Sequence, residues 1–246
     1  PELSFQETET AAFISTVLTE YEIEHETGIA KTGIVALIKG TNPGKRCVAL
    51  RADMDALPIL ESNTLDFASE NEGVMHACGH DFHSANLLGV AVLLNQLKAH
   101  FEGTIKLIFQ PSEEKIPSGA PAMIEAGVLE NPKVDRLIGQ HVSPELSTGT
   151  FGFCKGQFMA SADEIYLTVK GKGGHAAFPN TLVDPVLTAA QIIVNLQQVM
   201  SRKKSPFDPA VLSFGRLEAK GATNIIPDEV KIDGTLRAMN EEFRFE

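Results

Sequence analysis

Hydrophobic residues in the first half of the chain follow helical and strand-like patterns in turn. The predicted strands are residues 33–40, 46–55, 103–110 and 134–142, and the predicted helices are residues 8–21, the segment after His83, and residues 119–131. The helix after His83 has one apolar face, formed by Leu87, Leu88, Ala91, Leu94 and Leu97. The strands are apolar on both faces, which predicts an α/β fold with a mostly parallel sheet covered by helices on both sides.

The pattern changes after about Gly156. Alternating strands are predicted at residues 163–171, 210–221 and 229–239, with an amphipathic helix at 184–202 and the start of another at 240–246. The order β-α-β-β-α is the beginning of a split βαβ (ferredoxin-like) α+β domain whose last strand is missing. The sequence therefore predicts two domains, residues 1–157 and a truncated domain at residues 158–246.

Composition excludes several classes of protein. The chain has 246 residues and a net charge of −11 (21 Lys and Arg against 32 Asp and Glu), without a basic patch, so nucleic acid is not an expected partner. No apolar run approaches the roughly 18 residues that span a bilayer, so no membrane association is expected. Three separated cysteines, Cys47, Cys78 and Cys154, argue against a disulfide framework and favour a reducing, cytoplasmic location. The chain does not begin with Met, so an upstream signal segment stays open.

Reactive side chains follow the predicted core strands. Asp53 and Asp55 end one strand, Glu113 and Glu114 follow the next, and His141 follows the last. The carboxyl ends of parallel strands meet at one edge of a sheet, which is where ligands bind in open α/β folds. We therefore expect these groups to converge on one crevice.

The segment "HACGHDFH" adds soft donor atoms to that crevice. His76, Cys78, His80 and His83 lie within eight residues. Taken singly, such a cysteine or histidine is more often a core or turn residue than a ligand. Thiolate, imidazole and carboxylate together form a ligand set for zinc or a similar divalent ion. A thiol hydrolase with Cys78 as nucleophile would leave the glutamate pair and His141 unused, and a structural zinc site would need more cysteines.

Six motifs together resemble a known family. They are "RADMDALPI", "MHACGHDFHSANLLG", "FQPSEE", "AMIEAGVLEN", "GKGGHAAFP" and "NIIPDEVKIDGTLRAMNEE". In this order and spacing they are similar to the N-acyl-amino-acid amidohydrolases, which belong to the dinuclear-metal, carboxypeptidase-like metallopeptidases and include aminoacylases and hippurate hydrolases. The resemblance implies a metal-dependent hydrolase that cleaves the amide bond of N-acyl amino acids by attack of a metal-bound water.

The resemblance also implies a role for individual residues. The metal ligands would be Cys78, His80, Glu114 and His141, and the catalytic residues would be Glu113 as acid/base and His175 as oxyanion stabiliser. The substrate carboxylate would be held by Asn224 and Arg237, and Asp55 would orient a ligand imidazole. The cofactors would be two divalent ions of zinc, manganese or cobalt.

Several features of the family are expected only from the resemblance. Residues 1–157 would be the catalytic domain, and residues 158–246 a lid through which the protein forms a homodimer. The family has a further histidine ligand near its C-terminus and an additional first helix in its catalytic domain, and this chain has a counterpart of neither. Whether residues 1–246 alone are active is therefore open, and a dipeptidase or carboxypeptidase, or a non-catalytic metal-binding relative, remains an alternative.

Overall fold

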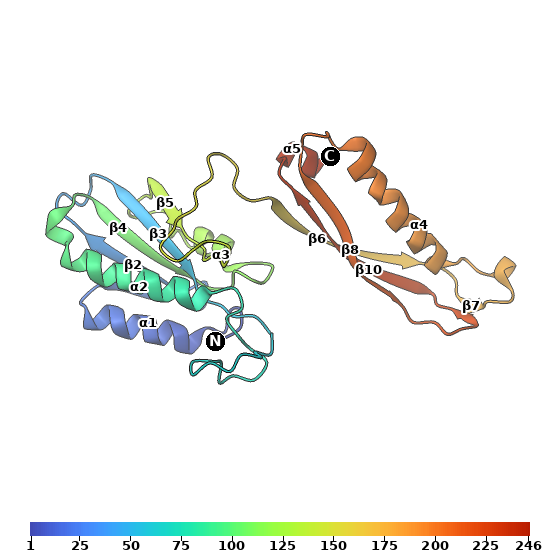
Figure 1. Cartoon of the computed structure of the whole chain (residues 1–246), viewed down its shortest axis with the longest axis horizontal. Coiled ribbons are helices and arrows are strands. Elements are labelled where there is room, and N and C mark those ends of the chain that lie inside the picture. Colours follow the sequence, from blue (N-terminus) through green and yellow to red (C-terminus); the bar gives the residue numbers. More distant parts are fainter. The chain divides into compact units, whose positions relative to one another are not determined.

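The computed structural model describes residues 1–246, which form two compact units (Figure 1). Unit 1 is Pro1–Thr148 and unit 2 is Gly149–Glu246. The sequence places the division later, between residues 157 and 158, because the hydrophobic pattern changes near Gly156. Residues between 149 and 160 contain no helix or strand, so the connecting segment begins before that change of pattern.

Unit 1 is built on a five-stranded sheet. Its strands are β1 (Glu24–Ile29), β2 (Gly33–Lys39), β3 (Cys47–Asp53), β4 (Thr104–Gln110) and β5 (Arg136–Gly139), in the order β1-β2-β4-β3-β5. β3 is parallel to β4 and β5, whereas β2 is antiparallel to β1 and β4. Only β2 is therefore reversed, and the sheet is mostly parallel, as predicted. The sequence missed β1, since its residues "EHETGI" are mostly exposed at a sheet edge and show no apolar alternation.

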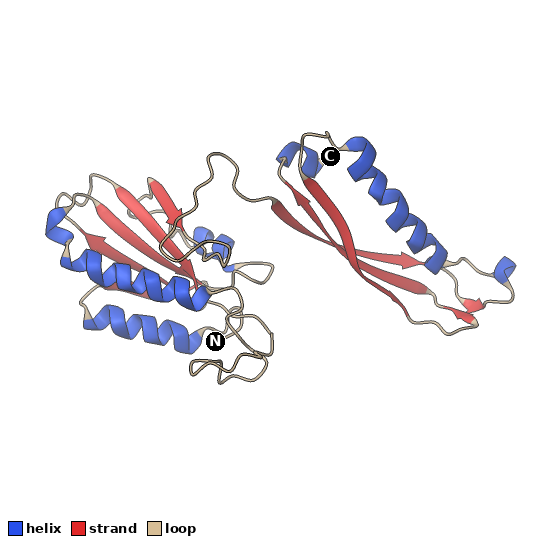
Figure 2. Ribbon diagram, viewed as in Figure 1, coloured by secondary structure: helices blue, strands red, loops and turns tan.

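Helices cover both faces of this sheet (Figure 2). α1 (Thr8–Glu20) and α2 (His80–Gln96), which is followed by the 3-10 turn η1 (Lys98–His100), pack on one face. α3 (Gly119–Glu125) packs on the other. In β4, Leu107 and Phe109 face α1 and α2 while Ile108 faces α3, because successive side chains of a strand point to opposite faces. The sheet is thus buried on both sides, and its strand ends are left to carry polar groups.

Unit 2 is a helix on a three-stranded antiparallel sheet. The strands are β6 (Ser161–Lys170), β8 (Ala210–Ala219) and β10 (Glu229–Ala238), in the order β6-β10-β8. The other elements are β7 (Gly174–His175), β9 (Ile225–Ile226), α4 (Pro185–Gln198), α5 (Glu241–Phe245), the 3-10 turn η2 (Pro179–Thr181) and the π turn η3 (Val199–Lys203). Ala189 of α4 packs on Val230 and Ile232 of β10. The β-α-β-β-α order agrees with the sequence pattern; the missing strand and the lid role stay predictions.

Neither unit contains a helix with the length and apolar character that crossing a membrane requires.

Candidate metal centre

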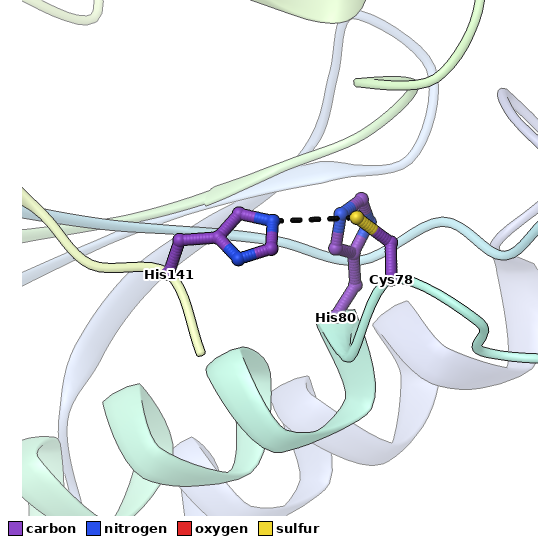
Figure 3. A group of neighbouring side chains, drawn as sticks. All are labelled: Cys78, His80 and His141. Carbon is purple, nitrogen blue, oxygen red and sulfur yellow. Dashed lines mark hydrogen bonds between the residues drawn. The ribbon is translucent and has the colours of Figure 1, made fainter. Parts of the chain in front are cut away.

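Three soft donor groups converge at the carboxyl edge of the unit 1 sheet (Figure 3). Cys78 and His80 lie at the start of α2, and His141 follows β5. Their ligand atoms all lie within 4.8 Å of one another, and Cys78 Sγ is 3.3 Å from His141 Nε2. The structure thus brings together a thiol and two imidazoles that are separated by up to 63 positions in the chain.

Gly79 makes the close approach of these groups possible. It precedes α2 with φ of +81°, a left-handed conformation that residues with a Cβ rarely adopt. A Cβ at this position would lie 2.5 Å from Cγ2 of Val142, the residue after His141. The glycine of the "CGH" motif therefore both turns the chain into α2 and lets the His141 loop pack against that turn.

The two imidazoles each present Nε2 to the centre. His80 Nδ1 lies 3.3 Å from Asp55 Oδ1, and His141 Nδ1 lies 2.7 Å from the carbonyl oxygen of Val142. These oxygens only accept hydrogen bonds, so in the neutral imidazole each Nδ1 carries the proton and each Nε2 has the lone pair. This is the tautomer that a histidine metal ligand requires.

His80 Nε2 is buried and has no hydrogen-bond partner. It lies 3.7 Å from Asp53 Oδ2 and 3.8 Å from Glu114 Oε1, and both of these are carboxylate oxygens. A buried lone pair that faces carboxylates loses its hydration without compensation. A divalent cation between these groups would satisfy all of them, so the donor set fits a metal ion.

Glu113 and Glu114 form a second group with the same histidine. Ligand atoms of His80, Glu113 and Glu114 lie within 4.8 Å of one another, so His80 belongs to both groups. Asp55 fixes the turn that carries the pair, because its two carboxylate oxygens each accept a 3.0 Å hydrogen bond from a backbone amide, one of Glu113 and one of Glu114. The glutamate pair predicted from the end of a strand thus lies beside the thiol and imidazole group.

The centre is electrostatically suited to a cation. Burial and the neighbouring Glu114 carboxylate raise the pKa of the Cys78 thiol to about 12. Burial and Glu114 likewise raise the pKa of Glu113. Burial alone would also raise the pKa of Asp55, but hydrogen bonds from His80, from the Ser4 hydroxyl and from two amides hold it well below its usual range. A bound divalent ion would offset the crowding of negative groups and favour the thiolate.

His83 lies beside the centre, but hydrogen bonds occupy both of its ring nitrogens. His83 Nδ1 donates to Asp53 Oδ1 at 2.7 Å, and its Nε2 accepts the Val142 amide at 2.9 Å. Both ring nitrogens are therefore used. The other oxygen of Asp53 accepts a 2.6 Å hydrogen bond from Arg51. Sequence reasoning singled out His83 only as part of the cluster; its role depends on a loop contact that no local pattern encodes.

Two candidate residues of unit 2 lie close together. His175 on β7 pairs with Ile225 on β9, and the amide of Ala176 donates to the carbonyl oxygen of Asn224 at 2.9 Å. His175 Nδ1 accepts the Ala177 amide at 3.1 Å, so the proton lies on the exposed Nε2.

Arg237, the third candidate of unit 2, lies on a different strand of that unit. It is an exposed residue of β10, and its Nε donates to Thr235 Oγ1 at 3.1 Å. Its guanidinium therefore points away from the core of unit 2.

Comparison with known proteins places the chain in a family. Residues 49–239 match the model of peptidase family M20/M25/M40. The chain is 48% identical over 245 residues to an N-acetylcysteine deacetylase of Bacillus subtilis (strain 168), covering 99% of this chain and 63% of that protein. It is 45% identical over 244 residues to an N-acyl-L-amino acid amidohydrolase of Geobacillus stearothermophilus, covering 99% and 65%. The chain therefore belongs to the M20/M25/M40 peptidase family.

Solved structures agree with this assignment. A dinuclear metal-binding peptidase of the M20 family from Bacillus subtilis is 44% identical, with a TM-score of 0.80 over 100% of this chain and 62% of that one. A protein from methicillin-resistant Staphylococcus aureus is 41% identical, with a TM-score of 0.92 over 100% and 64%. The chain thus spans slightly less than two thirds of the length of each of these four relatives.

The close approach at Gly79 gives a test of the centre. Gly79→Ala should weaken metal binding by about tenfold or more, because the methyl group would displace Val142 and with it His141. Gly73 has a similar φ of +77° with open space around it, so Gly73→Ala carries the same backbone cost and should leave metal affinity within about twofold. Equilibrium titration of the intact protein with Mn²⁺ measures both. Equal effects of the two substitutions would contradict the packing argument.

Proposed function

We propose that this protein is a metal-dependent hydrolase that cleaves the amide bond of N-acyl amino acids. The observation that carries the proposal is the unpartnered Nε2 of His80, which faces a thiol and imidazole group on one side and a glutamate pair on the other. The names of two similar relatives, a deacetylase of N-acetylcysteine and an amidohydrolase of N-acyl-L-amino acids, support the same substrate class.

Two divalent ions fit the two overlapping donor groups. Cys78, His80, Glu114 and His141 would hold them, and the dinuclear relative supports a pair of ions. A thiolate favours zinc, while the imidazoles and carboxylate also suit manganese or cobalt. A divalent ion held there would polarise the amide carbonyl of the substrate and lower the pKa of a bound water toward neutrality.

Glu113 would act as the acid/base. Its carboxylate lies in the group that it forms with His80 and Glu114. Burial and the Glu114 carboxylate raise the pKa of Glu113, which brings it closer to the range useful for proton transfer. It would accept a proton from the attacking water and give it to the departing amine. Glu114, held on the same turn, would bind metal and stay ionised.

Unit 2 would supply groups for the substrate. His175 keeps its proton on an exposed Nε2, which suits a hydrogen-bond donor to the developing oxyanion. Arg237 offers a planar guanidinium that can bind the substrate carboxylate through two hydrogen bonds, with Asn224 as a further donor. These roles require unit 2 to act as a lid, in this subunit or across a homodimer, and the three free cysteines fit a cytoplasmic location.

A peptidase is the second candidate. A relative named thermostable carboxypeptidase 2, from Saccharolobus solfataricus, is 43% identical over 246 residues. The same centre would cleave a peptide bond by the same steps, so a panel of N-acetyl and N-benzoyl amino acids against dipeptides distinguishes the two. A thiol mechanism fits less well, because a Cys78 thiol with a pKa of about 12 supplies little thiolate nucleophile in the absence of metal.

The glutamate pair can be separated by matched substitutions. Glu113→Gln should lower the turnover of N-acetyl amino acids by about 10²-fold or more, because the side-chain amide of Gln cannot accept and return a proton. Its metal content should stay at the wild-type level. Glu114→Gln should lower metal occupancy, measured by elemental analysis. Near-normal turnover in Glu113→Gln would show that the acid/base is another group.

His175→Ala should lower kcat by about 10²- to 10³-fold, because it removes a hydrogen bond that strengthens as negative charge develops on the carbonyl oxygen. Steady-state kinetics with N-acetyl amino acids measures the effect. His175→Gln, which retains an N–H donor, serves as the control and should lose less. A loss smaller than about tenfold in His175→Ala would count against the oxyanion role.

Arg237→Lys should raise KM for N-acyl amino acids by about tenfold, since a single ammonium cannot make the paired contacts of a guanidinium. KM for the corresponding amino acid amides, which lack the carboxylate, should change little. The comparison of the two substrate series is the measurement. Parallel increases in both would reject carboxylate binding by Arg237.

A further inference from the structure

The turn at the end of β4 is held by two buried carboxylates from distant parts of unit 1. Its three successive amides all donate to carboxylate oxygens: Ser112 to Glu7 Oε1 at 2.8 Å, and Glu113 and Glu114 to the two oxygens of Asp55 at 3.0 Å each. Asp55 follows β3, whereas Glu7 lies 105 positions before Ser112 and was not singled out by any sequence motif.

The Glu7 carboxylate makes its hydrogen bonds with Phe5, Thr32 and Ser112 rather than with the metal-binding groups, and it has no part in the chemistry proposed above. It is completely buried, with 0% of its surface exposed. All three of its hydrogen-bonding neighbours are donors: the amides of Phe5 and Ser112 on Oε1, and the hydroxyl of Thr32 on Oε2 at 2.6 Å. Both oxygens of the Glu7 carboxylate therefore act as hydrogen-bond acceptors.

The direction of the Glu7 side chain is unusual for its position. Glu7 is the N-cap residue of α1, where a carboxylate commonly accepts the first free amides of its own helix. It makes no such capping bond and reaches the turn after β4 instead. Glu2 carries out the local task, since its carboxylate accepts the amides of Glu9 and Thr10 at 3.0 and 2.8 Å.

The backbone at the held turn needs such support. Ser112 has φ of +48°, in the left-handed region that residues with a Cβ rarely adopt. It is fully buried, and its own hydroxyl has no hydrogen-bond partner. Such conformations persist where the surroundings fix them, and here they set the direction of the next two residues, Glu113 and Glu114.

We propose that Glu7 is a positioning residue whose carboxylate holds the Ser112 turn and thereby aims Glu113 and Glu114 at the metal centre. The role in aiming rests on the proposed function, because it concerns the acid/base and a metal ligand. The hydrogen bond to Ser112 is a property of the fold alone. Glu7 and Asp55 then act together, Glu7 on the Ser112 amide and Asp55 on the two amides that follow.

The test compares Glu7→Met with Glu2→Met in the intact protein. Both substitutions keep the approximate length of the side chain, and each removes a carboxylate of the N-terminal segment that accepts three hydrogen bonds. Only Glu7 contacts the β4 turn. Amide hydrogen exchange of the metal-free protein, Mn²⁺ affinity, and kcat and KM for N-acetyl amino acids are measured for each.

For Glu7→Met we expect faster exchange at residues 112–114, and Mn²⁺ affinity and kcat lower by about 10- to 100-fold with KM little changed. Glu2→Met should speed exchange only at Glu9 and Thr10, with Mn²⁺ affinity and kcat within about twofold of wild type. Thr32→Val removes one donor to Glu7 and should give a smaller effect in the same direction as Glu7→Met; it replaces that variant if Glu7→Met does not fold.

Unchanged exchange at Ser112 or unchanged Mn²⁺ affinity in Glu7→Met would overturn the positioning role. An equal loss of Mn²⁺ affinity in Glu2→Met would overturn it too, because the effect would then be one of general stability. A wild-type protein that binds no Mn²⁺ and hydrolyses no N-acyl amino acid would instead overturn the proposed function. The exchange experiment uses no metal or substrate, so the two failures are distinguishable.

Discussion

The hydrogen bonds of the Asp55 carboxylate organise the candidate metal centre. This carboxylate accepts hydrogen bonds from the Ser4 hydroxyl, from His80 Nδ1 and from the amides of Glu113 and Glu114. One buried side chain after β3 therefore ties the N-terminal segment, the start of α2 and the turn after β4 together. Because it holds the proton on His80 Nδ1, it also leaves Nε2 with a lone pair for a cation. Asp55 thus links the imidazole of α2 to the turn that carries the glutamate pair.

Elements with a strong hydrophobic pattern were predicted well, and the polar edge strand was not. The helices α1, α2 and α4 and the strands β2, β3 and β4 lie where apolar spacing placed them. α2 begins earlier than expected, at His80, because Gly79 turns the chain directly into the helix. β1 is defined by its pairing with β2 rather than by burial, so no apolar pattern marks it. The antiparallel direction of β2 was not predicted either, because it follows from the hairpin that β2 forms with the unpredicted strand β1.

The components of the site could be predicted because chemistry-bearing residues follow core strands. This rule placed Asp55, the glutamate pair and His141 at one edge, and the structure brings His141 to Cys78 and His80. The tautomers, the unpartnered Nε2 and the use of His83 as a support could not be predicted, since each depends on a carbonyl, amide or carboxylate from a distant segment. Glu7 shows the same limit: in the sequence it is an ordinary acidic residue before a helix.

Titration of the intact protein with Co²⁺ would show whether Cys78, His80 and His141 share a metal ion. Thiolate ligation gives cobalt a sulfur-to-metal charge-transfer absorption that nitrogen and oxygen ligands do not produce. We expect this absorption to grow with added Co²⁺ in the wild-type protein and to be lost in Cys78→Ser, whose other donors are intact. Co²⁺ binding without the absorption, or the same absorption in Cys78→Ser, would contradict this expectation.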